Sequence, residues 1–139
     1  MNFYRLEGLQ KTTLSRGSKE LLIHCKTQDI GVVVISAKTE KNLALSMSHL
    51  GLEDIPFYGG CNQTRKSDLM KSLNVDLYVG DQESDIIAAR NANVKAVYLS
   101  SSENIHALSI EPDYRITNIR QTISILSILQ KVKREAKNP

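Results

Sequence analysis

The sequence has 139 residues, of which 41% are hydrophobic and 24% are charged, and its formal net charge is +3. This length and balance predict a single globular domain over residues 1–139, with enough apolar residues for a core and little room for a second domain. The sequence shows no apolar run long enough to span a membrane, no signal peptide and too few aromatic residues for a base-stacking surface. We therefore expect a cytoplasmic protein that binds neither membranes nor nucleic acids.

Strand-like segments alternate with helical segments along the whole chain. The β-branched run at residues 32–35 is unbroken, which predicts a strand buried on both faces of a parallel sheet. Pro56 lies in a shorter run and cannot donate a ladder hydrogen bond, so this run is expected at a sheet edge. The expected strands are residues 3–6, 32–35, 55–58, 77–79, 94–99 and 114–116.

Helix signals fall between these strands. Ser18 and Thr39 are placed to cap helices, and Asn118 with Gln121 resembles a capping box at the start of a long last helix. The apolar stripe of that helix is expected to pack on the sheet, with a partner-binding groove as the alternative. The expected helices are residues 18–29, 39–50, 66–73, 85–92 and 118 onward. The alternation predicts an α/β fold with a doubly wound, Rossmann-like parallel sheet in three α/β/α layers.

Two aspartates follow the expected strand at residues 77–79. Gly80 lets the chain turn, Asp81 lies just beyond the carboxyl end of the strand, and Asp85 comes four residues later in the first turn of a helix. Such carboxylates commonly cap a helix and complement its dipole. Sites in open parallel sheets nevertheless lie at the carboxyl ends of strands, where two carboxylates can hold a hard cation. The residues alone are compatible with both interpretations.

The segment from Gly80 to Ala92, GDQESDIIAARNA, resembles the last motif of the haloacid dehalogenase-like (HAD) superfamily, whose members are mostly Mg²⁺-dependent phosphatases and phosphotransferases. The resemblance covers nearly the whole chain and implies a HAD-like core. Only 31 positions separate Arg5 from Ser36, and 30 separate Ser36 from Lys66, so the chain looks like a minimal member without a cap domain. Within the superfamily, such members tend to act on large substrates or to close their sites as oligomers, so the resemblance leaves a large substrate and a homo-oligomer as alternatives here.

The resemblance also implies a set of site residues. Ser36 and the neighbouring Ala37 match the phosphate-binding position after the second strand. Lys66 matches the lysine that neutralises the charge of the phosphate and the nucleophile, with Lys71, farther along the helix, as the second choice. Asp81 matches the Mg²⁺ ligand, and Asp85 matches the neighbouring acid that helps to hold the metal shell. The molecule bound by such a set would be a small phosphorylated compound.

The superfamily's first motif is altered in this chain. The motif is Asp-x-Asp-x-Thr, with a nucleophile followed by a general acid and base, whereas residues 5–9 read RLEGL. Glu7 can stand for the acid, but Arg5 cannot stand for the nucleophile, because a guanidinium stays protonated and has no lone pair to offer. We hypothesise that the charge of Arg5 replaces Mg²⁺ beside Asp81 and Asp85, which argues against a bound metal ion.

Three functional hypotheses follow. Arg5 favours a catalytically impaired domain that acts by binding or regulation. The phosphate-site and cation-site residues favour an active Mg²⁺-dependent phosphatase or phosphotransferase on a small phosphorylated metabolite or sugar, with an altered nucleophile or one supplied by a partner chain. A receiver-like signalling domain shares the fold, but it requires an acidic pair after the first strand, where only Glu7 is present.

Overall fold

A six-stranded parallel sheet forms the centre of the molecule. The computed structural model describes residues 3–6, 17–100 and 108–137. Every paired strand is parallel, and the strand order is β3-β2-β1-β4-β5-β6. The elements are β1 Phe3–Leu6, α1 Ser18–Thr27, β2 Gly31–Ile35, α2 Glu40–His49, β3 Phe57–Tyr58, α3 Gln63–Ser72, β4 Val75–Gly80, α4 Glu83–Asn91, β5 Lys95–Leu99, β6 Tyr114–Ile116, the 3₁₀ turn η1 Ile119–Gln121 and α5 Thr122–Lys137.

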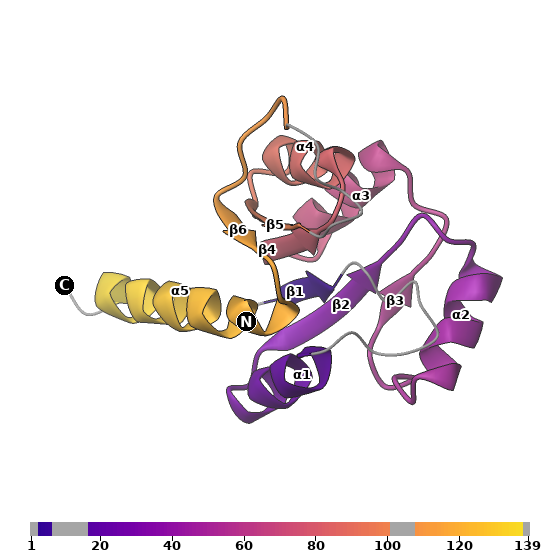
Figure 1. Ribbon diagram of the computed structural model, residues 1–139, viewed down its shortest axis with the longest axis horizontal. Coiled ribbons are helices and arrows are strands. Elements are labelled where there is room, and N and C mark those ends of the chain that lie inside the picture. Colours follow the sequence, from indigo (N-terminus) through magenta and orange to yellow (C-terminus); the bar gives the residue numbers. More distant parts are fainter. Residues whose placement is uncertain (1–2, 7–16, 101–107, 138–139) are drawn as a thin grey trace.

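Helices cover both faces of this sheet. In Figure 1, α3 and α4 lie on one side of the strands, and α1 lies on the other. The alternation along β4 explains the two sides, because Leu77 and Val79 pack with α1, α2 and α5, whereas Tyr78 between them packs with α3 and α4. The predicted doubly wound sheet in three α/β/α layers is confirmed. Between β2 and β4 the described chain holds only α2, β3 and α3, and no cap domain.

Local capping chemistry sets most of the helix starts, but Ser18 does not cap α1 as expected, because the cap position is Gly17 and no side chain caps it. Thr39 caps α2 as expected, since its side chain accepts a hydrogen bond from the amide of Asn42 at 3.2 Å. The capping box between Asn118 and Gln121 is also present, although it opens the 3₁₀ turn that precedes α5. The helix expected at residues 66–73 begins three residues earlier, at Gln63. Its cap is the Asn62 side chain, which accepts from the Arg65 amide at 2.8 Å.

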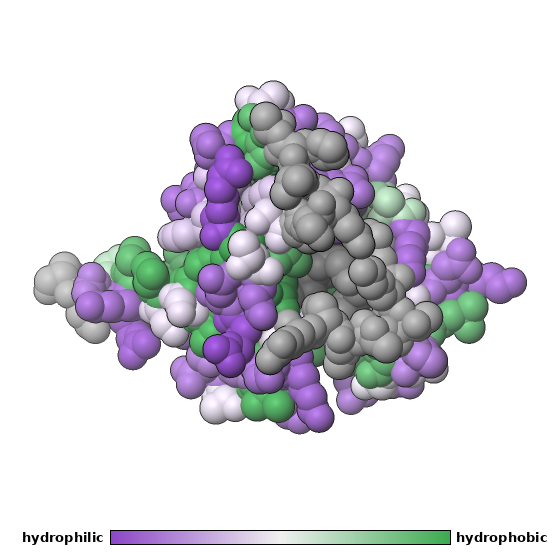
Figure 2. Space-filling view, in the orientation of Figure 1, coloured by the Kyte–Doolittle hydropathy of each residue, from purple (hydrophilic) through white to green (hydrophobic). Residues whose placement is uncertain are grey.

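The apolar stripe of the last helix is only partly in the core. Ile125 and Leu126 near its start are buried, as expected of a helix that packs on the sheet. Farther along, Ile128 is 52% exposed and Val132 is 56% exposed, so the expected core contact does not reach the outer half of α5. Figure 1 shows this half projecting from the body, and Figure 2 shows hydrophobic residues on its visible face. None of the described helices is long and apolar enough to cross a membrane.

Asp113, directly before β6, links this strand to β5 and α4 through hydrogen bonds. Its Oδ2 accepts hydrogen bonds from the Ala96 amide of β5 and from the Arg90 guanidinium of α4, both at 2.7 Å. Partial burial raises the pKa of Asp113, but these hydrogen bonds, together with the charges of Arg90 and Lys95, outweigh it and hold the pKa below its usual value. The ionised carboxylate thus stabilises the folded state.

This tether makes a pH-dependent contribution to stability. Because the pKa of Asp113 is lowered on folding, its contribution is fully present above the ordinary aspartate pKa of about 4 and is lost as the pH falls through the lowered value. We expect the free energy of unfolding of Asp113→Asn to fall less steeply than that of the wild type below about pH 4. Urea denaturation at a series of pH values measures this, with exposed Asp68→Asn as the charge-matched control. Parallel curves for Asp113→Asn and the wild type would contradict it.

Candidate functional site

The candidate site lies at the carboxyl ends of the central strands. β1 is flanked by β2 and β4, so the chain leaves three neighbouring strands at one edge of the sheet. Ser36 directly follows β2, and Asp81 directly follows β4. This is the edge at which open parallel sheets place their binding sites.

Ser36 is built into a tight turn at the end of β2. The residue is 6% exposed, and its hydroxyl oxygen accepts a hydrogen bond from the Lys38 amide at 3.1 Å. Its backbone amide donates to the Tyr58 carbonyl of β3, and its carbonyl accepts from the Cys61 amide, both at 2.9 Å. Ala37 lies exposed in the same turn. Because Cys61 directly precedes the cap of α3, these bonds fix the Ser36 turn to the start of the helix that carries Lys66.

Lys66 and Asp85 form a buried ion pair. The Lys66 ammonium lies 3.0 Å from Asp85 Oδ1, and the exposed fractions of the two side chains are 8% and 2%. A buried ammonium without a partner would be costly, so this pair constrains the packing of α3 against α4. The structure therefore brings these two predicted site residues into direct contact. Their pairing supplies a fixed positive group at the site, with its charge partly balanced.

Two further donors hold Asp85. The Tyr78 hydroxyl donates to Oδ1 at 2.9 Å, and the Gln82 amide donates to Oδ2 at 3.2 Å as half of a capping box. Gly80 is necessary here, because a Cβ on this residue would lie only 2.3 Å from Asp85 Cβ. The absence of a side chain at Gly80 lets Asp85 lie directly against the end of β4.

Asp81 has a more open environment than Asp85. It is half-buried in the turn between β4 and α4. Burial raises the pKa of the neighbouring Tyr98, and the negative charge of Asp81 raises it further, against the opposing effect of Arg115. Asp81 therefore acts electrostatically on the ends of β4 and β5. Asp85, by contrast, pairs with Lys66.

The predicted cation-binding role of Asp81 and Asp85 stays a prediction, and the structure places the two carboxylates in different environments. Within residues 17–100 and 108–136, no three His, Cys, Asp or Glu side chains come together as a metal-binding group. The two oxygens of Asp85 accept from an ammonium, a hydroxyl and an amide, so Lys66 already places a positive charge beside this carboxylate.

Arg5 lies on β1, and its backbone position is defined by the strand register. It pairs with Val33 of β2 and Tyr78 of β4, so it lies three positions before Asp81 along the neighbouring strand rather than directly opposite it. The next residue, Leu6, pairs with Val79. Glu7 lies outside the described residues, and its predicted role stays a prediction.

Sequence reasoning missed Tyr78. The sequence predicts Tyr78 only as part of the apolar strand at residues 77–79, whereas its hydroxyl donates a hydrogen bond to Asp85. A signal was nevertheless present, because a tyrosine within a buried strand needs a hydrogen-bond partner for its hydroxyl. Helical periodicity could not identify that partner, because it relates residues within one helix. The contact instead joins Tyr78 of β4 to Asp85 in the first turn of α4.

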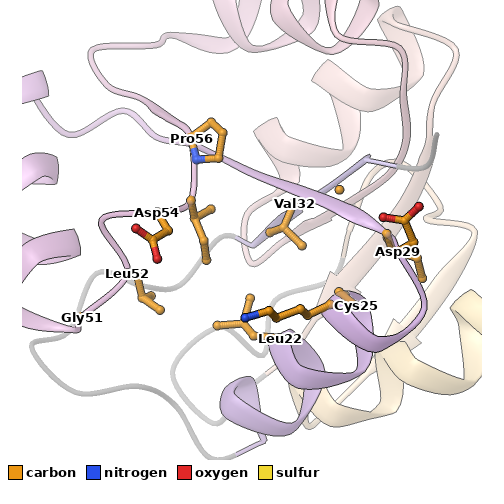
Figure 3. A pocket seen from close by; sticks show the side chains of 12 residues that line it. Leu22, Cys25, Asp29, Val32, Gly51, Leu52, Asp54 and Pro56 are labelled. Carbon is orange, nitrogen blue, oxygen red and sulfur yellow. The ribbon is translucent and has the colours of Figure 1, made fainter.

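A separate groove lies at the opposite end of β2. Its volume is about 530 Å³, and mostly apolar residues line it between the end of α1, the start of β2 and residues 51–56. Figure 3 shows Leu22, Val32 and Leu52 along this groove, with Asp29 and Asp54 to either side. The groove is at the amino ends of the strands, away from Ser36 and Asp81. We therefore place the candidate site at the carboxyl edge and not in this groove.

Comparison with known proteins agrees with the fold and the motif. The family described as haloacid dehalogenase-like hydrolase matches residues 2–99. No curated protein matches the sequence.

Solved structures share this architecture at low sequence identity. A predicted phosphoglycolate phosphatase from Haemophilus somnus 129PT is 21% identical, with a TM-score of 0.66 over 81% of this chain and 57% of that chain. The L-2-haloacid dehalogenase RSc1362 is 12% identical, with a TM-score of 0.70 over 83% of this chain and 57% of that chain. The core domain of a proposed phosphoglycolate phosphatase from Streptococcus pneumoniae TIGR4 is 17% identical, with a TM-score of 0.64 over 90% of this chain and 93% of that chain.

These likenesses establish the fold. This chain spans 57% of the length of the first two structures, and it spans nearly all of the isolated core domain.

The buried ion pair leads to a stability prediction. Asp85→Ala would leave the Lys66 ammonium buried without its carboxylate, which should lower the free energy of unfolding by about 3–5 kcal/mol. Asp68→Ala is the control, since Asp68 is an exposed aspartate on the same helix as Lys66, and its removal should change the free energy by less than about 0.5 kcal/mol. Urea denaturation of the three proteins measures both values. A loss for Asp85→Ala no larger than that for Asp68→Ala would show that the pair does not form.

Proposed function

Because this chain belongs to the haloacid dehalogenase-like hydrolase family, we propose that its carboxyl-edge site binds the phosphoryl group of a small phosphorylated molecule. The observation that carries this proposal is the buried Lys66 ammonium, held at 3.0 Å from Asp85. A positioned ammonium is a suitable donor for a phosphate oxygen. Ser36 adds a hydroxyl whose oxygen is held by the Lys38 amide, so its proton is available for an anion. Ala37 lies in the same turn and contributes backbone only.

We propose binding rather than catalytic turnover because β1 carries an arginine at the position of the family's nucleophile. Arg5 stands at the position that matches the nucleophile of the family, and an arginine side chain cannot attack phosphorus. In this proposal, the chain is a catalytically impaired member of the family and acts as a binding or regulatory domain. Residues 1–139 would form one domain for this role, and association of copies into a homo-oligomer would enclose its open site.

The proposed role of Arg5 is that of a built-in cation. β1 lies directly beside β4, and β4 leads into the turn that carries Asp81. A fixed positive charge in this region would lower the affinity for a divalent metal ion through repulsion. Asp85 adds to this effect, because its oxygens already accept hydrogen bonds from Lys66, Tyr78 and a backbone amide.

A second candidate function is active phosphate transfer. The surviving arrangement of Ser36, Lys66, Asp81 and Asp85 favours it, since these groups are the ones that would position and neutralise a phosphoryl group. It requires another nucleophile, either Glu7 or a residue from a partner chain. Mg²⁺ dependence belongs to this second candidate, with Asp81 as the ligand of the ion and Asp85 as the neighbouring acid that helps to hold the metal shell.

Phosphate binding tests the first proposal directly. Lys66→Met should weaken the affinity for inorganic phosphate or a phosphomonoester by about tenfold or more, because a hydrogen bond to a charged group is lost. Lys71→Met is the matched control, since Lys71 is exposed near the other end of the same helix, and this variant should bind as the wild type does. Isothermal titration calorimetry gives both affinities, and circular dichroism checks folding. Equal affinities in the two variants would argue against Lys66 as the anion site.

Magnesium titration and turnover distinguish the two functions. We expect the wild type to bind Mg²⁺ at least about tenfold more weakly than Arg5→Asp, since the substitution exchanges a repelling charge for a ligand. We also expect neither the wild type nor Asp81→Asn to turn over a panel of phosphomonoesters with Mg²⁺. Tight Mg²⁺ binding by the wild type would overturn the role of Arg5. Wild-type turnover that disappears in Asp81→Asn would establish the second candidate, and Glu7→Gln would then test its nucleophile.

A further inference from the structure

The least expected polar contact at the site is made by a strand tyrosine. Tyr78 is 1% exposed in the middle of β4, yet its hydroxyl reaches Asp85 Oδ1 at 2.9 Å. The same oxygen accepts from the Lys66 ammonium at 3.0 Å. We infer that Tyr78 is a positioning residue, which holds Asp85 and through it orients the Lys66 ammonium of the proposed anion site. This inference rests on the proposed phosphate site.

The location of Tyr78 follows from the strand itself. Side chains alternate along β4, so Leu77 and Val79 face one side of the sheet and Tyr78 faces the other, where α3 and α4 pack. Lys66 comes from α3 and Asp85 from α4. Tyr78 thus approaches the ion pair from the sheet beneath the two helices. The three side chains join one strand and two helices through a single carboxylate oxygen.

Sharing this oxygen affects how strongly Asp85 holds the lysine. A buried carboxylate needs donors for its charge, and it receives them from the tyrosine hydroxyl and the Gln82 amide as well as from Lys66. With these neutral donors in place, the carboxylate of Asp85 is fixed in position, and it in turn fixes the position of the Lys66 ammonium. Without the hydroxyl, Oδ1 would rely on Lys66 more heavily and would itself be less well oriented. Both changes weaken anion binding.

The contact of Gly80 with Asp85 makes the arrangement rigid. A Cβ at Gly80 would overlap the Asp85 side chain at 2.3 to 2.5 Å, so the carboxylate is packed against the end of β4. Asp85 therefore has little freedom to compensate for a missing donor by shifting toward another one. The hydroxyl of Tyr78 is for this reason expected to affect the position of Lys66, although it does not itself contact the proposed ligand.

The test compares two buried tyrosines with inorganic phosphate as the probe. Tyr78→Phe should weaken phosphate binding by about three- to tenfold, the effect of one ordinary hydrogen bond. Tyr98→Phe is the matched control, because Tyr98 is 3% exposed and packs in the same core cluster. It should bind phosphate within about twofold of the wild type, a change below one hydrogen bond. A purely structural role would lower stability in both variants and affinity in neither, and that result would overturn the inference.

A double-mutant cycle tests the same inference without a ligand. Tyr78→Phe, Lys66→Met and the double variant are compared by urea denaturation. If both side chains act through Asp85, their effects on the unfolding equilibrium constant should depart from additivity by at least about threefold. If the wild type binds no phosphate, the proposed function fails, and the cycle alone decides: coupling supports the shared role of Tyr78 and additivity overturns it. The same cycle decides if Tyr78→Phe is too unstable for calorimetry, because denaturation reports on marginally folded variants as well.

Discussion

The buried contact between Lys66 and Asp85 constrains the arrangement of the whole carboxyl edge. Neither charge can be removed from water without the other, so α3, which carries the lysine, and α4, which carries the aspartate, must meet over β4. The α3 cap follows a segment tied to the end of β2, where the Cys61 amide donates to the Ser36 carbonyl. The turns after β2 and β4 are thereby held relative to one another. The proposed phosphate site depends on this relation.

Much of the fold could be predicted because local patterns and tertiary packing agree in this chain. The unbroken run in β2, the proline before β3 and the Thr39 cap each have a single physical interpretation, and each was confirmed. The start of α3 was misplaced because its cap, Asn62, follows two glycines and a cysteine, which read as a loop. The exposed outer half of α5 was missed for a different reason. Helical periodicity shows which side of a helix is apolar, but it does not show how far the rest of the protein extends along it.

The sequence indicates which residues form the candidate site, but it indicates less well how their side chains contact one another. A spacing of four residues puts Asp81 and Asp85 at the start of the same helix, and it suggested that they would share a ligand. The spacing could not reveal that Gly80 leaves room for Asp85 to pair with Lys66, while Asp81 lies half-buried in the turn before α4. That difference depends on contacts of Asp85 with the Gly80 backbone and with side chains of β4 and α3. The same limit applies to Arg5, whose position relative to Asp81 is set by strand register and not by distance along the sequence.

The two outermost strands of the sheet have a consequence for behaviour at high concentration. β3 contains two residues and β6 contains three, whereas β4 in the interior contains six. An edge strand can pair with a strand of another chain through its unpaired backbone groups, and a longer edge strand has more of them. Pro56 directly before β3 has no amide hydrogen and cannot extend this pairing. The edge strands of this sheet therefore have few unpaired backbone groups through which aggregation by strand pairing could start. The long hydrophobic strands that would aggregate most readily lie in its middle, where both neighbours are already paired.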